Sequence, residues 1–406
     1  KLTDPEKIEL DGLLYVMERL PKGIEECRFV RLISREGYET SHLTPIVPAR
    51  RKRNCYRLDE QIMYVEMTRG RSDIYDILTH LTFLYIESRK IQQNSTDPKG
   101  KISSNWKMLE EFVKREKLGE ELEIESAAAY LSHIIGRTYE ETVHAVQKFA
   151  ESSNSNSLFS IVYHLGKIAM EESNQGLDRE ISFSATLRER VGHHVYGELW
   201  ANRIKEALLD RNLIHRPIHI ISANMHSVLN TIYAHQALGA NSFEEIEELA
   251  TAISIKSKNN QGKKILAYAE KQGFIDLPDE SGTNIGAQLI DTAQMEVDTL
   301  IPGVVLPKEK EKRPVFVVMD YAFGEQAYET IDELLKPFQK DIFLNVESVS
   351  IMGKAGILQG GKGDIMIPSA HINEGTGDNY FFHNELTAEM LKGNGIAVFE
   401  GPMITV

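Results

Sequence analysis

Residues 315–335 read Val-Phe-Val-Val-Met-Asp-Tyr-Ala-Phe-Gly-Glu-Gln-Ala-Tyr-Glu-Thr-Ile-Asp-Glu-Leu-Leu. The apolar run 315–319 predicts a buried strand, and a helix is expected over 324–335 after a glycine turn. Further strands are expected at 346–352 and 363–368. Strands and helices that alternate at these lengths favour an α/β fold with parallel strand pairs and helices on both faces of the sheet.

The same alternation begins about a hundred residues earlier. A short apolar strand at 217–221 is followed by a small polar loop and by a helical pattern at 228–238, which is the start of a βα unit. Residues 242–272 carry helical spacing, and Ser281-Gly282-Thr283-Asn284 predicts the cap of another helix over 285–298. We therefore expect an α/β domain over 213–406 with a helical insertion around 240–300.

The first 212 residues follow a different pattern. Apolar residues recur there at i, i+3 and i+4, with breaks at glycine and at Ser/Asn-rich stretches. This spacing predicts a mostly α-helical N-terminal region, either a bundle or an array without a detectable repeat. The expected helices cover 73–88, 106–116, 121–135, 139–151, 158–172 and 186–210.

Composition limits the class of function. The 406 residues carry a net charge of −14, with 42% apolar and 26% charged residues. A packed core is therefore feasible, and the acidic balance argues against broad contact with nucleic acid or an anionic membrane. No apolar run approaches the roughly 18 residues of a membrane span. The two cysteines, Cys27 and Cys55, match no zinc motif and indicate a reducing compartment, so we expect a cytoplasmic protein.

The densest motif is the glycine-rich stretch 352–368. Gly356 and Gly361-Lys362 satisfy the first part of a P-loop. However, Gly363 stands where Ser or Thr would hold magnesium, and a strand pattern follows where a phosphate-capping helix is needed. A P-loop is therefore not expected.

The same stretch resembles the nucleoside phosphorylase and nucleosidase superfamily. The resemblance is carried by Val349-Ser350-Ile351-Met352-Gly353-Lys354-Ala355-Gly356-Ile357-Leu358 and by Gly363-Asp364-Ile365-Met366-Ile367-Pro368. The preceding strand, glycine turn and helix at 315–335 fit the family pattern as well. The layout of a helical region before an α/β domain is loosely similar to AMP nucleosidase. The resemblance implies an α/β domain that binds a purine nucleoside or nucleotide.

Two departures from the family pattern shape the expected reaction. Phosphorylases carry Gly-Asp-Pro-x-Arg after their first strand, but the matching place here reads Ser222-Ala223-Asn224-Met225-His226. They also carry an arginine before the glycine motif, and here that position is Ile351. Because a buried anion needs paired cations, phosphate is a poor nucleophile candidate here and water becomes the expected one. The resemblance therefore implies a nucleosidase, with Lys354 as a candidate for holding a 5′-phosphate or, alternatively, as the partner of a nearby acid.

The resemblance also implies which residues contact the substrate. Glycines at strand ends let the backbone approach a flat base and a sugar. The superfamily carries its catalytic carboxylates further along than Val406, so the resemblance implies that they lie beyond this residue. The chain ends in a β-branched run typical of a strand interior, which fits this expectation. No cofactor and no metal is expected, and the family suggests a homo-oligomer. The expected substrate contacts are Gly353, Lys354, Ala355, Gly356, Gly324, Glu325, Asn224, His226, His371 and Glu374.

Two further groups of residues leave alternatives open. The basic cluster at 49–57 is either a solvated loop or a site for a phosphate group. His371, Glu374 and Asp378 are either an ordered polar loop or a metal site. The leading hypothesis is an N-glycosidic bond hydrolase, and the alternative is a non-catalytic nucleotide-binding or regulatory protein on the same fold.

Overall fold

The computed structural model describes residues 4–97, 101–120, 123–152, 155–239, 245, 261–296, 304–322, 324–356, 358–373, 377–393 and 395–405. The chain forms two compact units, Lys1–Ser350 and Ile351–Val406. Both contain β-sheet, and the fold is mixed α/β, as expected from the sequence.

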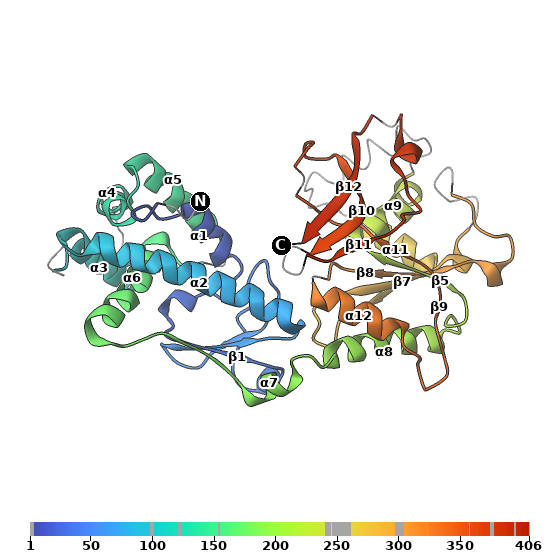
Figure 1. Ribbon diagram of the computed structural model, residues 1–406, viewed down its shortest axis with the longest axis horizontal. Coiled ribbons are helices and arrows are strands. Elements are labelled where there is room, and N and C mark those ends of the chain that lie inside the picture. The colour runs from blue at the N-terminus through green and yellow to red at the C-terminus, as the bar shows by residue number, and fades with distance from the viewer. Residues whose placement is uncertain are drawn as a thin grey trace. The chain divides into compact units, whose positions relative to one another are not determined.

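The first sheet of unit 1 has the strand order β2-β3-β1-β4. Figure 1 labels its strand β1. β1 (Phe29–Ile33) pairs in parallel with β3 (Ile62–Glu66) on one side and with β4 (Glu180–Phe183) on the other. The short β2 (Cys55–Arg57) runs antiparallel to β3. The region expected to be mostly helical therefore also builds a sheet, which the helical spacing did not predict.

Helices pack on this sheet through one shared apolar core. Several begin at a serine or threonine whose side chain accepts a backbone N–H, as helix starts require; Ser103, Thr138 and Ser157 cap their helices in this way. The helices are α1 (Leu10–Met17), α2 (Gly70–Ser95), α3 (Ser104–Lys117), α4 (Ile124–Ile135), α5 (Tyr139–Glu151), α6 (Leu158–Gln175) and α7 (Ala185–Arg190).

The second sheet of unit 1 has the order β6-β7-β8-β5-β9 and helices on both faces (Figure 1). One core packs α8 and α12 against one face, and a separate core packs α9 and α11 against the other. β5 and β8 are parallel, whereas β6 and β7 are antiparallel additions. The elements are α8 (Val195–Asp210), β5 (Pro217–Ser222), α9 (Met225–Leu238), α11 (Gln261–Lys271), β6 (Phe274–Leu277), β7 (Ala287–Asp291), β8 (Val315–Met319), α12 (Glu325–Leu335) and β9 (Asn345–Ile351).

One expected element is wrong. The helix expected over 285–298 is replaced at Ala287–Asp291 by strand β7, which pairs with β8; residues 297 and 298 lie outside the described residues. All five residues of β7 are buried, so the strand shows no alternation that would separate it from a helix. The supposed cap is a loop folded around Asp279, whose carboxylate accepts the backbone N–H groups of Ser281 and Asn284 at 2.9 and 2.7 Å.

The expected helical insertion around 240–300 is corrected accordingly. Its described part contains one helix, α11, followed by the two strands β6 and β7. Of its earlier part, residues 240–244 and 246–260 lie outside the described residues.

Unit 2 is a small sheet with the order β11-β10-β12. β10 (Ile365–Asn373) pairs in parallel with β12 (Val398–Thr405), and the register shifts between Pro368 and Ala370. β11 (Asn379–Phe381) runs antiparallel to β10. Short 3₁₀ turns complete the two units, at Ile24–Glu26, Tyr38–Thr40, Thr292–Gln294, Lys310–Lys312 and Ala388–Leu391.

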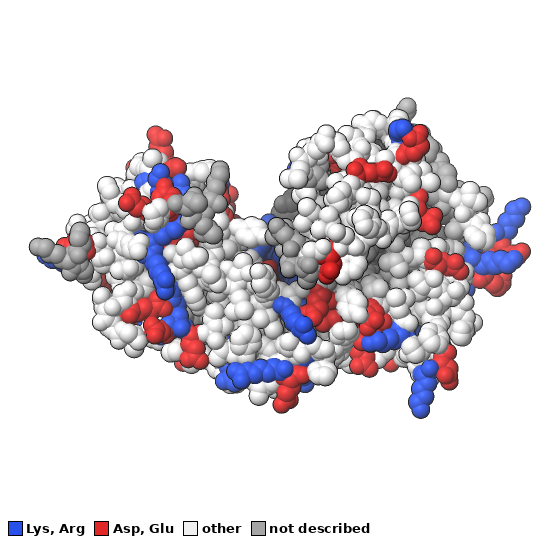
Figure 2. Space-filling model, viewed as in Figure 1, with Lys and Arg blue, Asp and Glu red and all other residues white. Residues whose placement is uncertain are grey.

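None of the helices in the described part of the chain is both long enough and apolar enough to cross a bilayer. On the face shown in Figure 2, basic and acidic side chains are interspersed. The basic residues on that face therefore do not form one large positive patch.

Candidate functional site

Four of the expected substrate contacts lie at one edge of the second sheet. β5 and β8 are parallel, with Ser222 opposite Met319, so their carboxyl ends meet at the same edge. Asn224 follows β5 and caps α9 by accepting the N–H of Ser227 at 2.9 Å, and His226 lies exposed in the first turn of that helix. Ligands gather at such carboxyl ends in open α/β sheets.

Gly324 and Glu325 lie at the other half of this edge, between β8 and α12. Gly324 has φ 53° and ψ −125°, a conformation that favours glycine. A Cβ atom there would stand 2.5 Å from the Oγ atom of Ser72. The turn therefore brings the start of α12 against the start of α2.

The two helices cap each other. The Ser72 Oγ atom accepts the backbone N–H of Glu325 at 2.9 Å, and the Glu325 Oε2 atom accepts the backbone N–H of Arg71 at 2.7 Å. Gly70, with φ 67°, permits the approach, because a Cβ atom there would lie 3.1 Å from Glu325 Oε2. Glu325, expected to touch substrate, is thus hydrogen-bonded within the protein.

The remaining expected contacts belong to unit 2. Gly353, Lys354, Ala355 and Gly356 form an exposed stretch after β9 without regular secondary structure. His371 is half-buried in β10, where it pairs with Tyr380 of β11, and Glu374 lies outside the described residues. The sequence motif at 353–356 is therefore exposed chain in this structure.

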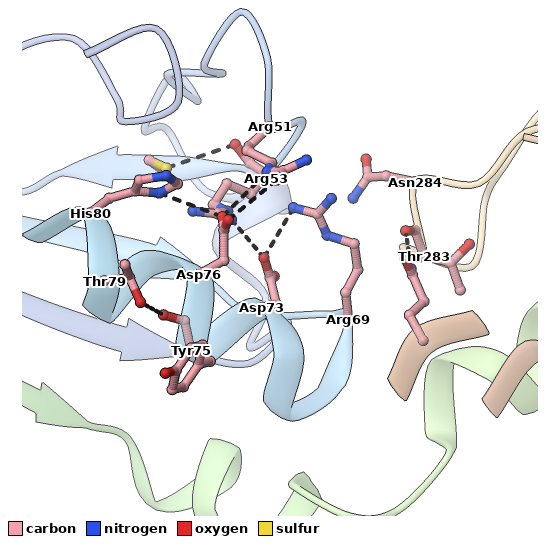
Figure 3. A network of polar contacts seen from close by, with 12 residues as sticks. Arg51, Arg53, Arg69, Asp73, Tyr75, Asp76, Thr79, His80, Thr283 and Asn284 are labelled. Atoms are coloured by element: carbon pink, nitrogen blue, oxygen red, sulfur yellow. Dashed lines mark hydrogen bonds and ion pairs between the residues drawn. The ribbon is translucent and has the colours of Figure 1, made fainter. Parts of the chain in front are cut away.

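An arginine cluster stands beside the paired helix starts, and its members come from the basic stretch 49–57 and from the end of β3 (Figure 3). The Arg53 Nη2 atom donates to Asp73 at 2.7 Å and to Asp76 at 2.6 Å. Arg69 donates to Asp73 at 3.0 Å, and Arg51 donates to Asp76 at 3.3 Å. The stretch 49–57 is thus not simply a solvated loop, because Arg53 is only 1% exposed.

The cluster keeps an excess of positive charge, since three guanidinium groups face two carboxylates. Burial raises the pKa of Asp76, but the hydrogen bond and charge of Arg53, together with Arg51, outweigh it and hold that pKa below its ordinary value. The Asp76 carboxylate therefore stays ionised at neutral pH. The Nε and Nη1 atoms of Arg53 and the Nε atom of Arg69 are buried without a hydrogen-bond partner, which is uncommon for buried donors.

A cavity of about 90 Å³ opens on this cluster and is lined by Arg51, Arg69, Ser72, Asp73, Asp76 and Gln326. α2 contributes the positive end of a 26-residue helix dipole. Gln326 is fixed by a hydrogen bond from its Nε2 atom to the carbonyl of Thr283 at 2.8 Å. Guanidinium groups at a helix start form a site for one anion of phosphate size. We call this cavity the arginine pocket.

Another polar group was not expected from the sequence. His194, Asp332 and Glu333 bring three metal-ligand atoms within 4.8 Å of one another, the one such group among the described residues. The Lys336 ammonium group bonds both acids, at 3.0 and 2.6 Å. This charge offsets one of the two negative charges, and the group forms a network of ion pairs and hydrogen bonds that joins α8 to α12.

Sequence reasoning found only part of the arginine pocket. The basic stretch containing Arg51 and Arg53 was noted, but Arg69, Asp73 and Asp76 were not connected with it. The available signal was the run Arg69-Gly70-Arg71-Ser72-Asp73 between a strand and a long helix, a pattern typical of a helix start that binds anions.

Comparison with known proteins identifies a family without naming an activity. No curated protein and no solved structure matches the chain significantly. A family model described as a family of unknown function, DUF6909, matches residues 1–252 and 249–406. These two matches span the whole sequence, and the chain belongs to the DUF6909 family.

Proposed function

We propose that this protein binds a purine nucleotide by its phosphate group and hydrolyses the N-glycosidic bond. The observation that carries the proposal is the arginine pocket. It places a cavity of phosphate size, lined by two arginines and two aspartates that also pair with the buried Arg53, beside the glycine turn Gly324–Glu325. This turn belongs to the stretch that resembles nucleosidases. Arg51 and Arg69 would then hold the phosphate, a role that the sequence alone suggested for Lys354.

The pocket supports a nucleotide over an unphosphorylated nucleoside. A nucleoside has no anion to match the excess positive charge of the cluster, whereas a phosphate accepts several hydrogen bonds from guanidinium groups. Arg69 lies between β3 and α2, at the carboxyl end of a parallel strand where α/β folds bind phosphorylated ligands.

A binding protein without turnover is the second candidate, and one observation favours it. Glu325 is the carboxylate nearest the glycine turn, and it already accepts the N–H of Arg71 and pairs with the Arg71 side chain at 3.6 Å. A carboxylate held in this way has less freedom to support an oxocarbenium-like transition state.

Release of free base tests the proposal. The protein is incubated with AMP, adenosine, inosine and methylthioadenosine, with and without phosphate, and free base is followed by chromatography. We expect base from AMP without added phosphate, and less from the unphosphorylated nucleosides. Arg69→Gln should raise the KM for AMP at least about tenfold and leave turnover of adenosine within about twofold.

Arg50→Gln is the matched control, because Arg50 neighbours the cluster in sequence but is exposed and pairs with Glu18, outside the cluster. It should leave both substrates unchanged. Absence of base from every substrate, together with a rise in melting temperature on adding AMP, would favour the binding protein. No turnover and no melting shift with any nucleotide would overturn the proposal.

A further inference from the structure

A second, larger cavity lies against the arginine pocket. It has a volume of about 540 Å³ and runs between α1 and α2, where Tyr15, Tyr75, His80 and Phe83 line it. Ser72 and Asp76 line both cavities, so the two lie side by side along α2. We call this second cavity the aromatic groove.

The two cavities differ in chemistry. The arginine pocket carries the guanidinium groups of Arg51 and Arg69, whereas four of the residues that line the groove carry rings and none is an arginine or a lysine. Its volume is in the range of about 300–1,000 Å³ typical of small-ligand sites, while the pocket is large enough only for a small group. A ligand that spans both would have an anion at one end and a flat, largely apolar body at the other.

Two rings of the groove are open to solvent, and one of them, that of Tyr15, is held in place by a neighbouring arginine. Tyr15 is 51% exposed and Tyr75 76% exposed, so a ligand can reach both rings from solvent. Arg19 covers one face of the Tyr15 ring, with its guanidinium carbon 3.4 Å from the ring centroid, and also donates to the Tyr15 carbonyl at 2.8 Å. This contact fixes a ring on which a flat ligand can stack.

His80 supplies a polar group in the same groove. It is 6% exposed, and its buried Nδ1 atom lies 3.6 Å from Asp76 Oδ2 without a hydrogen-bond partner. Burial, with the charges of Arg53, Arg51 and Arg19, lowers the pKa of His80 against the opposing effect of Asp76. Its imidazole is therefore neutral at pH 7. Because Nδ1 faces Asp76, a ligand would hydrogen-bond at Nε2.

We infer that the aromatic groove receives the sugar and base of the nucleotide whose phosphate occupies the arginine pocket, with the base stacked on Tyr15 or Tyr75 and within reach of His80. The inference rests on the proposed phosphate site but goes beyond it. It assigns the base to α1 and α2, not to the exposed stretch 353–356. The two residues that line both cavities, and the aromatic side chains that line the groove, carry it.

Titration calorimetry measures the affinities for AMP, ribose 5-phosphate and inorganic phosphate. Comparing the three affinities separates the contributions of base, sugar and phosphate. The wild type should bind AMP at least about tenfold more tightly than ribose 5-phosphate, since stacking on an aromatic ring adds affinity for any base. Tyr15→Leu and Tyr75→Leu should remove most of that difference and leave the affinity for inorganic phosphate within about twofold. Arg69→Gln should weaken all three ligands.

Tyr139→Leu is the matched control, because Tyr139 is 44% exposed on α5 and lines neither cavity. A second measurement uses the unmodified protein, so it does not depend on the variants folding. In saturation-transfer NMR, the H2 and H8 protons of AMP should receive more saturation than the ribose protons.

The two proposals fail in distinguishable ways. Equal affinity for AMP and ribose 5-phosphate, or no effect of either tyrosine variant, would overturn the groove and leave the phosphate site standing. No binding of AMP, ribose 5-phosphate or phosphate to the wild type would overturn both.

Discussion

Ser72 and Glu325 cap each other's helices across unit 1, although they lie far apart in sequence. The Ser72 Oγ atom accepts the first N–H of α12, and the Glu325 carboxylate accepts an N–H in the first turn of α2. The geometry is that of a capping box divided between two helices. Each helix start is thereby satisfied by the other, and the arginine pocket forms beside their junction.

Removal of the Ser72 hydroxyl should loosen this junction. Ser72→Ala leaves the N–H of Glu325 without its partner, and loss of a helix cap costs about 1 kcal/mol of unfolding free energy. Urea denaturation at pH 7 measures the change. Ser126→Ala, in an exposed turn of α4, should change stability by less than about 0.5 kcal/mol. Equal effects of the two variants would contradict the role of Ser72.

Gly324 should tolerate no side chain. Gly324→Ala would place a methyl group 2.5 Å from Ser72 Oγ at a φ of 53°, so we expect a loss of about 1–3 kcal/mol. Gly262→Ala is the control, because nothing lies within 4 Å of a Cβ atom at this position in α11. That control should stabilise the protein by about 0.5–1 kcal/mol. Thermal and urea unfolding compare the two, and a neutral Gly324→Ala would refute the close approach.

Arg53 should be required for the stability of the fold as well as for the positive charge of the arginine cluster. The Asp73 side chain is 2% exposed, and in Arg53→Met its carboxylate would keep Arg69 as its partner but lose Arg53. Because breaking a buried ion pair costs about 3–5 kcal/mol, we expect a loss of unfolding free energy of this size. Adding Asp73→Asn to Arg53→Met should recover part of this loss, as a double-mutant cycle in urea would show. Strict additivity of the two substitutions would argue against the coupled network.

Glu25 should make stability depend on pH. Burial raises its pKa from 4.5 to about 6, and Asn156 donates to Oε1 at 2.6 Å. Because the folded state favours the protonated acid, this group's contribution is complete below pH 4.5 and is lost as the pH rises through 6. Glu25→Gln, which keeps the acceptor for Asn156, should therefore stabilise the protein by about 2 kcal/mol at pH 7.5 and hardly at all at pH 4. Unfolding curves at both pH values check this, and a gain independent of pH would disprove it.

The sequence predicted the elements whose pattern is local. β5 and β8 are apolar runs that end at small polar or glycine turns, and the helices that follow them, α9 and α12, start within a few residues of the expected positions. β7 was mistaken for a helix because it is buried on both faces, and β1 was overlooked because short strands carry little periodicity.

The candidate site was harder to predict, for a physical reason. The arginine pocket draws Arg51 and Arg69 from two loops of the first sheet and Gln326 from a helix on the second sheet. A local pattern reveals a helix start or a basic loop, but it does not report which of them meet in space. The glycine motif at 353–356 was conspicuous in the sequence and is exposed in the structure.

The parallel pairing of β1 with β4 bears on how the chain folds during synthesis. The partner of Phe29 is Glu180, so one edge of β1 stays open while all of α2 to α6 is translated. At ordinary rates of translation this interval lasts on the order of ten seconds. An open apolar strand edge invites pairing with other nascent chains. We therefore expect fragments that stop before residue 180 to aggregate or to need a chaperone, whereas chains that include β4 close the sheet themselves.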